Sequence, residues 1–591
     1  MASDDARVDV MGEADAVAAT GDPGGGRASW QRRAIRVLPL LLAVAVFVVG
    51  AWNNRWMSDD GFIHLRIVEQ IEAGNGPVFN AGERVEASTS PAWTWLLTAL
   101  DVVLPFRLEW IAVITGIALS ALGLWLAMWA AVALNLERDR DRGRDRVLIP
   151  AGGLVLSVLP AMWINATMGL ENGLVFAWLG LVAWRLCRWA SGENRLGWAE
   201  AVLVGAGTLV RPELALVTVV MLGIVVAGEW RTSRRRHLFG LVVAALALPI
   251  AYEVFRAGYY ASLVPNSGIA KEASASYWSS GWEYLVDSVG PYALWFPVAV
   301  LLVAVLIPVV RSARRAGRGR VVAVALGFPA AGLLVGLFVI RVGGDFFHAR
   351  LLLPPLLALL VPVAAVTWDR RFAAGVAVVP WAVLSLVWMR PGFLPGSLEV
   401  GRNPVTIDDY EPILNGIPPT WIDGPGAYVG LGRLDQPPPP GIETAVAAYG
   451  VGSIGYALGP DVYVLDQLGL GDALTARLEL STRGPVVGHE KPLPAPWTAA
   501  RITAPGSVPD ESDFTIDPRV LRSIDDPAGR AWTDRVADAR ATLDCGSVSD
   551  LDEAISEPLT VGRFLSNVAG APGFTRLRIP PEPRAAREEF C

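Results

Sequence analysis

The fold is decided by the stretch QRRAIRVLPLLLAVAVFVVGAWNNRWMSDDGFI, residues 31–63. Its apolar run, about 37–52, is not closed by a small-residue cleavage site, so it predicts an uncleaved membrane anchor rather than a signal peptide. Because Arg32, Arg33 and Arg36 precede this run, its N-terminal end is predicted to stay in the cytoplasm. The acidic pair Asp59-Asp60 would then lie just outside the membrane on the opposite side.

The composition supports a membrane protein with many spans. Hydrophobic residues make up 53% of the 591 residues, charged residues only 18%, and the mean hydropathy is +0.41. A soluble domain could not hide so much apolar surface behind so little charge. The net charge of -7 offers no basic face to a nucleic acid, which excludes that class of partner.

Further spans can be placed by their apolar runs, since about 20 residues cross roughly 30 Å of hydrocarbon. The total is about nine to eleven, because the two short runs 198–211 and 213–228 could form one re-entrant pair. Ala92–Phe106 is placed at the outer interface, because a span there would move the later basic loops off the cytoplasmic side. The additional candidates lie near 109–135, 148–164, 173–190, 198–211, 213–228, 238–255, 289–310, 321–341, 351–367 and 373–390.

Three regions follow from this topology. Residues 1–33 predict a disordered cytoplasmic tail, and 34–390 a transmembrane catalytic domain with outer loops at 53–108 and 256–288. Residues 391–591 are rich in Pro and Gly and contain short β-like pieces such as Val462–Leu465, so they predict a mixed α/β extracytoplasmic domain. No internal repeat is evident, which weighs against a transporter built from inverted halves.

The three cysteines and four histidines give little sign of a metal site. Cys187 falls in an apolar run and is expected to be a buried thiol. An extracytoplasmic location would allow Cys545 and Cys591 to form a disulfide; two free thiols are the alternative. Neither cysteine has the spacing of a zinc site, and the histidines are scattered along the chain.

Ionisable residues collect at the predicted outer ends of the spans. Such groups near hydrocarbon cost several kcal/mol unless they are paired or hydrated, so they often mark function. Acids and bases on one face of a helix bundle suggest a site for an anionic, membrane-embedded substrate. The candidate residues are Asp59, Asp60, Glu86, Glu171, Arg211, Glu213, Lys271, Asp345, His348 and Arg350.

The aspartate pair has two interpretations. Ser58, Asp59 or Asp60 could simply cap an interfacial helix. Two adjacent carboxylates at the membrane edge favour chemistry instead, because glycosyl transfer needs a carboxylate to accept a proton or to stabilise an oxocarbenium centre. Asp59 and Asp60 are therefore the candidate catalytic residues.

The other candidates are predicted to bind substrate. Lys271 could meet a donor phosphate as a point charge, and Arg350, after the flexible pair Gly343-Gly344, could hold phosphate oxygens in a fork. His348 is equally compatible with a packed interface histidine. Arg211 and Glu213 are equally compatible with an internal ion pair and with a phosphate contact.

The ordered set of motifs resembles a known family. It resembles the terminal β-(1→2) arabinofuranosyltransferase (AftB) family of mycobacterial-type cell walls, within the GT-C superfamily of membrane glycosyltransferases. Single fragments occur more widely in that superfamily, and the order of the whole set carries the likeness. The motifs are WMSDDGFIHLRIVEQIEAGNGPVFNAGERVEASTSPA at 56–92, MGLENGL at 168–174, VRPE at 210–213, FRAGYYASLVPNSGIAK at 255–271, GGDFFHARLLLP at 343–354, VLDQLGLGDAL at 464–474, GHEK at 488–491 and GRFLSNV at 562–568.

This resemblance implies a GT-C fold in the plasma membrane, with the active site and the C-terminal domain on the periplasmic side. It implies decaprenyl-phosphoryl-arabinofuranose as donor and the non-reducing end of arabinogalactan or lipoarabinomannan arabinan as acceptor. The family's aspartate pair falls on Asp59 and Asp60, and the C-terminal domain would help to hold the glycan. Donor sugar and product linkage are both β in this family, so net retention is implied.

Several alternatives stay open at this point. The aspartate pair could hold Mg²⁺ or Mn²⁺ through waters, whereas the cations at 211, 271 and 350 offer a metal-free way to stabilise phosphate. The enzyme could use polyprenyl-phosphate-mannose instead of the arabinose donor. A lipid-linked sugar transporter or flippase is a different class, but it would place ionisable groups near the bilayer midplane.

Overall fold

The structure is a computed structural model that describes residues 23–135, 147–230, 233–367, 372–388, 405, 428–429, 445–448, 450–480, 490–503, 508, 511 and 530–591. Its first helix, α1 (Pro23–Asn53), begins ten residues before the end of the tail predicted over 1–33. A proline at the first helical position suits helix initiation, because its missing N–H would be unpaired there anyway. Residues 23–33, which were predicted as part of the tail, are therefore included in α1, and 1–22 lie outside the described residues.

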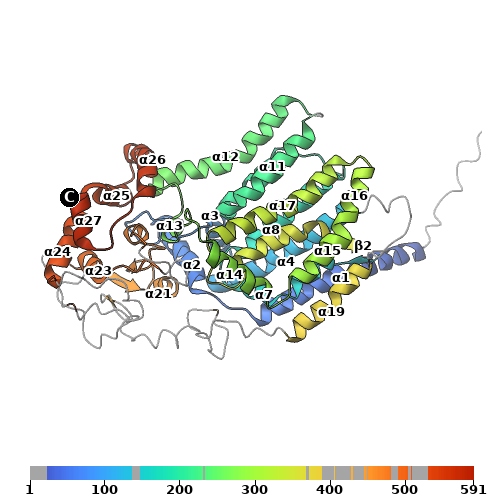
Figure 1. Cartoon of the computed structure of the whole chain (residues 1–591), viewed down its shortest axis with the longest axis horizontal. Helices are drawn as coiled ribbons and strands as arrows, with labels where there is room; N and C mark the ends of the chain where they lie inside the picture. Colours follow the sequence, from blue (N-terminus) through green and yellow to red (C-terminus); the bar gives the residue numbers. More distant parts are fainter. Residues whose placement is uncertain are drawn as a thin grey trace, which may run out of the picture.

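Within the described residues, six helical segments are long and apolar enough to cross a membrane. Four shorter apolar helical stretches accompany them, at Val37–Asn53, Trp198–Val210, Arg350–Val363 and Ala377–Val387. The chain is thus a polytopic helical membrane protein (Figure 1), as the composition predicted. The long segments are α4 (Leu108–Asn135), α8 (Asn172–Ala190), η1 with α11 (Pro212–Leu214, Ala215–Glu229), α12 (Arg235–Tyr260), the series α15, η2 and α16 (Trp295–Leu301, Leu302–Leu306, Ile307–Arg315), and α17 (Gly319–Arg341).

Two predicted spans each contain a short strand as well as short helices. The run 148–164 forms β1 (Leu148–Ile149), α6 (Ala151–Ser157) and α7 (Pro160–Thr167), because Pro160 cannot continue the helix before it. The run 351–367 is divided into η3 (Arg350–Leu352), α18 (Leu353–Leu360), η4 (Val361–Val363) and β2 (Val366–Thr367). The strands β1 and β2 pair antiparallel, with Leu148 opposite Thr367.

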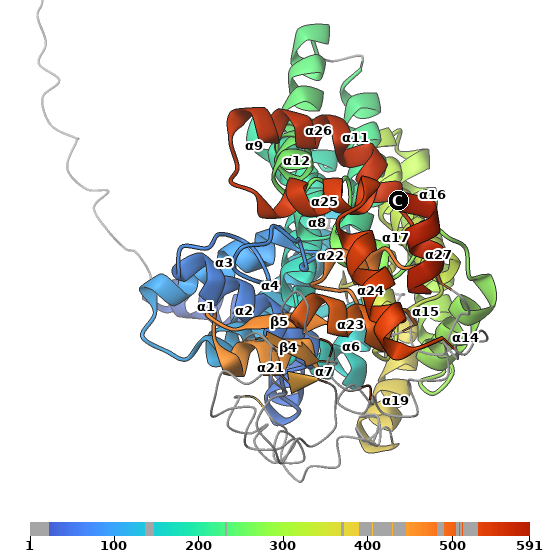
Figure 2. The ribbon, with the colours of Figure 1, turned by 90° about the vertical axis from the view of Figure 1, so that its left-hand side faces the viewer.

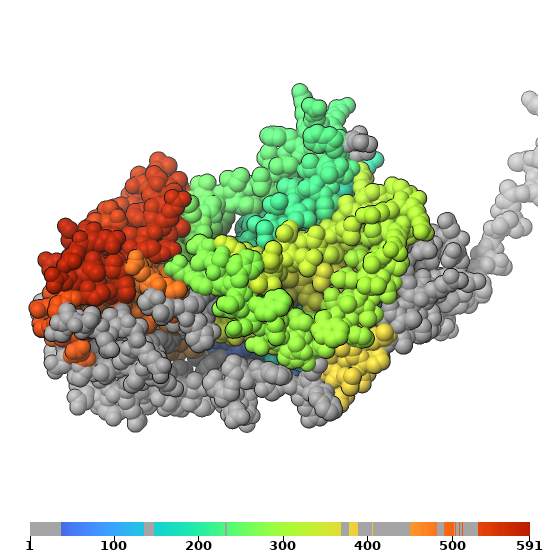
Figure 3. Space-filling view, viewed as in Figure 1, coloured from blue at the N-terminus to red at the C-terminus, as the bar shows by residue number. Residues whose placement is uncertain are grey.

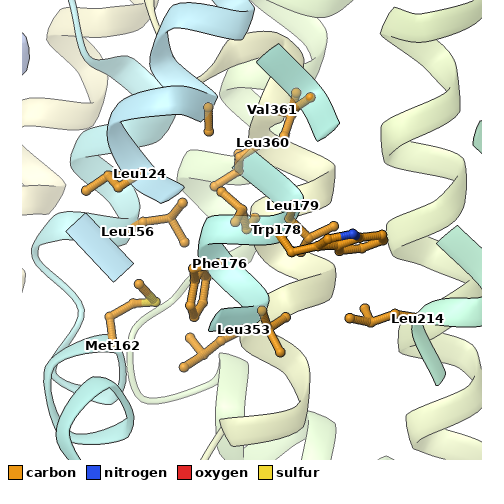
Figure 4. Close-up of a cluster of buried hydrophobic side chains, with 14 of the residues drawn as sticks. Leu124, Leu156, Met162, Phe176, Trp178, Leu179, Leu214, Leu353, Leu360 and Val361 are labelled. Carbon is orange, nitrogen blue, oxygen red and sulfur yellow. The ribbon is translucent and has the colours of Figure 1, made fainter. Parts of the chain in front are cut away.

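The transmembrane helices pack closely where glycines line their contact. At Gly123 on α4, an added Cβ would lie 2.2 Å from the carbonyl oxygen of Phe176 on α8, so only glycine permits this approach. Large apolar side chains fill the space around this contact. Leu124, Leu156, Phe176 and Leu353 come from four helices and meet in one buried cluster (Figure 4).

The C-terminal part gathers at one end of the helical bundle (Figure 1), and Figure 2 views this end from the front. It contains a parallel sheet in the order β3-β4-β5, which confirms the strand predicted at Val462–Leu465. A second buried cluster around Trp497 and Ile579 forms its core, and Cys545 is bonded to Cys591. Its elements are β3 (Tyr428–Val429), β4 (Ala445–Ala448), α21 (Val451–Leu458), β5 (Tyr463–Asp466), α22 (Ala473–Ala476), α23 (Ala495–Ile502), α24 (Trp532–Leu543), α25 (Gly546–Ser556), α26 (Val561–Arg576) and α27 (Pro583–Phe590).

Four helices lie between the bundle and this end (Figure 1). They are α2 (Asp59–Glu72), α3 (Pro91–Val103), α13 (Asn266–Ala270) and α14 (Trp278–Val289). α3 covers most of the stretch Ala92–Phe106 and is not among the apolar segments long enough to span a membrane, in keeping with its predicted interfacial place.

A buried arginine fastens α2 to the C-terminal part. Arg66 is fully buried, and its guanidinium donates to the carbonyl oxygens of Gly455 at 2.5 Å, Gly459 at 2.9 Å and Val462 at 2.7 Å. It also donates to the carbonyl of Phe79 at 2.8 Å. Five N–H donors in a fixed fork make arginine suited to this task. The two parts of the chain are therefore locked together beside the residues that follow Asp60.

Candidate active site

A cavity of about 820 Å³ lies between the ends of the transmembrane helices and the C-terminal part. Its walls come from α2, the loop before α8, the α10–η1 junction (α10, Gly207–Val210), the loop around α13, the end of α17 and the segment after α26. Figure 3 shows the C-terminal residues, in red, lying against the green segment that contains α12 to α14. Segments more than 500 residues apart in sequence thus share one cavity, with Asp60 on one and Arg578 on another.

Most of the predicted site residues line this cavity. Seven of them do: Asp60, Glu171, Arg211, Glu213, Lys271, Asp345 and Arg350. The three others, Asp59, Glu86 and His348, are not among the residues that line it. The charged groups therefore converge as the outer-loop pattern predicted, but not every member of the set takes part.

The cavity wall holds a network of alternating charge. The guanidinium of Arg350 lies 2.5 Å from a carboxylate oxygen of Asp345 and 3.8 Å from one of Asp60. The guanidinium of Arg211 contacts the carboxylates of Glu171 and Glu213. Both arginines are buried or nearly so, and a buried ion pair needs such multiple contacts to offset desolvation.

His64 extends this network on the side of α2. Its Nε2 lies 3.6 Å from a carboxylate oxygen of Glu171, and its Nδ1 is 3.0 Å from the hydroxyl of Thr94. Burial tends to raise the pKa of Glu171, but Arg211 and His64 outweigh it and hold that pKa well below the usual range. Glu171 is therefore a carboxylate at neutral pH and not a proton donor.

The loop that contains Asp345 and Arg350 begins with two glycines in a backbone conformation of positive φ, which other residues rarely adopt. Gly343 and Gly344 have φ of 96° and 79°, and an added Cβ at Gly344 would lie 2.4 Å from the ring of Tyr284. The hydroxyl of Tyr284 donates to the carbonyl of Phe347 and accepts from the N–H of Leu351, each at 3.1 Å. Tyr284 thus bridges this loop and sets the direction of Arg350.

Asp59 points away from the cavity and caps a helix of the C-terminal part. Its carboxylate accepts from the N–H groups of Gly452 at 3.2 Å and Ser453 at 2.8 Å, and from the hydroxyl of Ser453 at 2.6 Å. These donors belong to the first turn of α21, where N–H groups lack helical partners. The cap of α2 itself is Ser58, whose hydroxyl accepts from the N–H of Gly61. Of the predicted pair, Asp59 therefore binds the first turn of α21, and Asp60 lines the cavity.

The close packing of α21 against α2 predicts that a side chain at Gly452 destabilises the protein. A Cβ added there would lie 1.8 Å from the carbonyl oxygen of Asp59, so Gly452→Ala must push α21 away from α2. We expect a loss of about 2–3 kcal/mol of stability, typical of forced overpacking, and a lower apparent Tm in detergent. Gly450→Ala is the matched control, because its nearest atom would lie 3.4 Å away. Equal melting of the two variants would contradict this packing.

Glu86 and His348, which were predicted to bind substrate, do not line this cavity, and their side chains contact other parts of the protein. The carboxylate of Glu86 accepts from Arg256 at 2.6 Å and from the hydroxyl of Tyr252 at 2.7 Å, and so ties the loop 73–90 to α12. The Nε2 of His348 lies 3.0 Å from the hydroxyl of Tyr292. Both residues lie in outer segments, but their side chains turn into protein contacts that sequence position alone cannot reveal.

Several cavity residues were not predicted. His64 could have been found, because it follows Asp60 by four positions and so shares its face of α2. Arg576 and Arg578 had no such signal, since they lie at the end of α26 in the C-terminal part. Asn266 holds part of the cavity wall in place without lining the cavity itself. Its side-chain amide donates to the carbonyls of Gly469, Leu470 and Asp472, and Leu470 lines the cavity.

The described side chains offer no ready cation site. No group of three or more His, Cys, Asp and Glu residues with metal-binding geometry occurs among them. Asp59 and Asp60 do not converge, because the oxygens of Asp59 accept from α21. Asp60 and Asp345 both lie beside Arg350, whose positive charge opposes a cation there. The donor set therefore does not fit a dedicated divalent-cation site.

Comparison with known proteins gives a consistent result. The chain is 34% identical to the terminal β-(1→2)-arabinofuranosyltransferase of Mycobacterium tuberculosis over 93% of its own length and 97% of that protein. It is 36% identical to the enzyme of the same name from Corynebacterium glutamicum, over 65% of the chain and 57% of that protein. Residues 440–585 match the AftB family C-terminal domain. Among solved structures, ArnT from Cupriavidus metallidurans bound to undecaprenyl phosphate aligns with a TM-score of 0.39 and 19% identity, over 57% of this chain and 60% of that one.

Proposed function

Because this chain belongs to the terminal β-(1→2)-arabinofuranosyltransferase family, it is a membrane glycosyltransferase, and we propose that it transfers arabinofuranose from a polyprenyl-phosphate donor to an arabinan chain. The donor of this proposal is decaprenyl-phosphoryl-arabinofuranose. The acceptor is the non-reducing end of the arabinan of arabinogalactan or lipoarabinomannan, and the product is a terminal β-(1→2) linkage.

One observation carries this proposal: a single cavity at the ends of the membrane helices combines carboxylates with several cations. A donor of this type presents a sugar that becomes positively charged as the glycosidic bond breaks, and a phosphate that gains charge. Asp60, the member of the aspartate pair on the cavity wall, is placed to stabilise the sugar cation. Basic side chains in the same cavity are suited to the phosphate.

The proposed reaction breaks the bond between the anomeric carbon and the phosphate oxygen, and the electron pair leaves with the phosphate. A hydroxyl oxygen of the acceptor forms the new bond to the anomeric carbon, and its proton passes to the departing phosphate. Retention of the β configuration follows when the hydroxyl attacks from the face that the phosphate leaves, while Asp60 supports the opposite face. No cation is assigned a step in this scheme.

We place the cavity and the C-terminal part on the outer, periplasmic side of the plasma membrane. The short loops rich in Lys and Arg then fall on the cytoplasmic side, as the usual bias of membrane proteins requires. The bond between Cys545 and Cys591 supports the same placement, because disulfides persist in oxidising compartments outside the cytoplasm. The polyprenyl tail of the donor remains in the bilayer.

The function is tested by supplying the purified protein with polyprenyl-phosphoryl-arabinose and a synthetic arabinan acceptor. We expect a product extended by one residue, whose new linkage is read as β-(1→2) by NMR. A product formed from polyprenyl-phosphoryl-mannose, with none formed from the arabinose donor, would show that the enzyme is a mannosyltransferase instead. Transport of the lipid-linked sugar across a vesicle membrane without any transfer would favour a flippase.

A further inference from the structure

The charges around the cavity are divided into two groups of opposite sign. One group contains four carboxylates, Asp60, Glu171, Glu213 and Asp345, against the two guanidiniums of Arg211 and Arg350. The other group consists of cations, Lys271, Arg576 and Arg578. The acids of the first group more than neutralise its arginines, so Arg211 and Arg350 leave little positive charge for a ligand.

The acid next to Lys271 in sequence, Glu272, is paired with other cations. Lys271 is the C-cap residue that follows α13, and Glu272 comes directly after it. The carboxylate of Glu272 contacts the ammonium group of Lys491 and lies 3.4 Å from the guanidinium of Arg578. Lys271 itself has no ion-pair partner in the described part of the chain. It is thus a cation on a cavity wall with no acid to balance it.

Arg576 is held beside the same loop by its neighbours in sequence. The N–H of Leu263 donates to the hydroxyl of Thr575 at 2.9 Å, and Arg477 donates to the carbonyl of Phe574 at 2.8 Å. Thr575 also lines the cavity. The side chain of Arg576 is exposed at the cavity and, within the ranges that the structure describes, makes no ion pair. The end of α26 is therefore fixed while its arginine stays available.

We propose that Lys271 and Arg576 together bind the phosphate of the polyprenyl donor, so that the C-terminal part completes the donor site. This inference rests on the proposed function for the identity of the donor. A phosphodiester carries one negative charge, which suits two cations that no carboxylate balances, and arginine adds a planar fork for two of its oxygens. The family resemblance implies that the C-terminal domain helps to hold the glycan acceptor, and in this proposal it also helps to hold the lipid donor.

This division of charge also matches the direction of the reaction. When the glycosidic bond breaks, the electron pair and negative charge move toward the phosphate, at Lys271 and Arg576. Positive charge develops on the sugar ring, toward Asp60 and the carboxylate-rich wall. Both changes are favourable in a site whose charges are fixed in advance, since fixed groups need no reorganisation at the moment of reaction. The two groups of charge therefore orient the donor as well as bind it.

The proposal is tested with Arg576→Gln, Lys271→Gln and the control Arg584→Gln in the full-length protein. Arg584 is exposed on α27, pairs with Glu588 on its own helix, and does not line the cavity. Binding of polyprenyl phosphate is measured without acceptor, and the KM for donor and acceptor is measured in the transfer assay. We expect each cavity variant to weaken lipid-phosphate binding and raise the donor KM about 10- to 100-fold, as for lost hydrogen bonds to a charged group, with the acceptor KM unchanged.

Two further ligands and one further variant identify what is bound. Phosphate-free polyprenol should bind all variants alike, and Arg576→Lys should recover part of the lost affinity. Wild-type binding of polyprenyl phosphate by Arg576→Gln, or an equal loss for polyprenol, would overturn the proposal. Tighter binding of inorganic phosphate than of polyprenyl phosphate would overturn the assignment to the lipid. Because lipid binding is measured without turnover, failure of arabinose transfer would refute the proposed function separately.

Discussion

Asp60→Asn is expected to lower kcat by about 10³-fold or more, the range typical of a lost catalytic carboxylate or of lost electrostatic stabilisation. Asp60 is the member of the acidic pair that lines the cavity. The neutral amide cannot support positive charge on the sugar, although it fills the same space. The variant should still insert in the membrane, bind polyprenyl phosphate and melt near the wild-type temperature. The change removes one charge from the cavity wall and keeps the size of the side chain, so the packing of the protein is not altered.

Asp59→Asn is the matched comparison and should retain activity within about tenfold of wild type. Its side-chain oxygen can still accept from the N–H of Ser453 in α21. Burial raises the pKa of Asp59 above its usual value even though Ser453 hydrogen bonds oppose this, so a neutral side chain is tolerated there. The two variants are compared by steady-state kinetics and thermal unfolding. If Asp59→Asn were as inactive as Asp60→Asn at an unchanged Tm, the assignment of Asp59 to helix capping would be wrong.

The sequence was sufficient for features that depend on local pattern. Apolar runs gave the long helices such as α4 and α17, because membrane thickness fixes how many apolar residues a span needs. The clustering of charge at one end of the predicted spans located the cavity residues Glu171, Arg211 and Arg350, since such groups are costly beside hydrocarbon. The break before Pro160 was not decided by the proline alone, since Pro249 and Pro329 lie inside the continuous helices α12 and α17.

The features that were missed depend on contacts between distant segments. Asp59 and Asp60 are adjacent in sequence, yet Asp59 meets Ser453, 394 positions away, and Asp60 faces the cavity. The carboxylate of Glu86 forms an ion pair with Arg256 on α12 and does not line the cavity. Arg576 joins the cavity through contacts of its neighbours with the loop before α13. Partners of this kind follow from tertiary packing, which no periodicity or spacing within one segment encodes.

Arg350→Gln is expected to have the second-largest effect, about 10²- to 10³-fold on kcat. The guanidinium of Arg350 is buried and lies between Asp345 and Asp60. Its removal leaves these two carboxylates without their shared counter-ion, and breaking a buried pair in this way costs about 3–5 kcal/mol. Part of that cost should appear as a lower Tm. The rest should appear as loss of kcat, because the two unbalanced carboxylates repel each other and Asp60 is then held less firmly beside the sugar.

The double variant Arg350→Gln/Asp345→Asn separates charge balance from a direct contact with substrate. Removing the Asp345 carboxylate together with Arg350 takes away one of the two carboxylates that lost their counter-ion. We therefore expect a higher Tm than that of Arg350→Gln, and a kcat about tenfold or more above it. Arg341→Gln is the matched control, because Arg341 ends α17 nearby and its guanidinium donates to the carbonyl of Ser274 and the hydroxyl of Ser276. If the double variant were no better than Arg350→Gln alone, Arg350 would act on the substrate directly. Recovery would instead show that its task is to balance the charges of Asp345 and Asp60 and so to hold Asp60 in position.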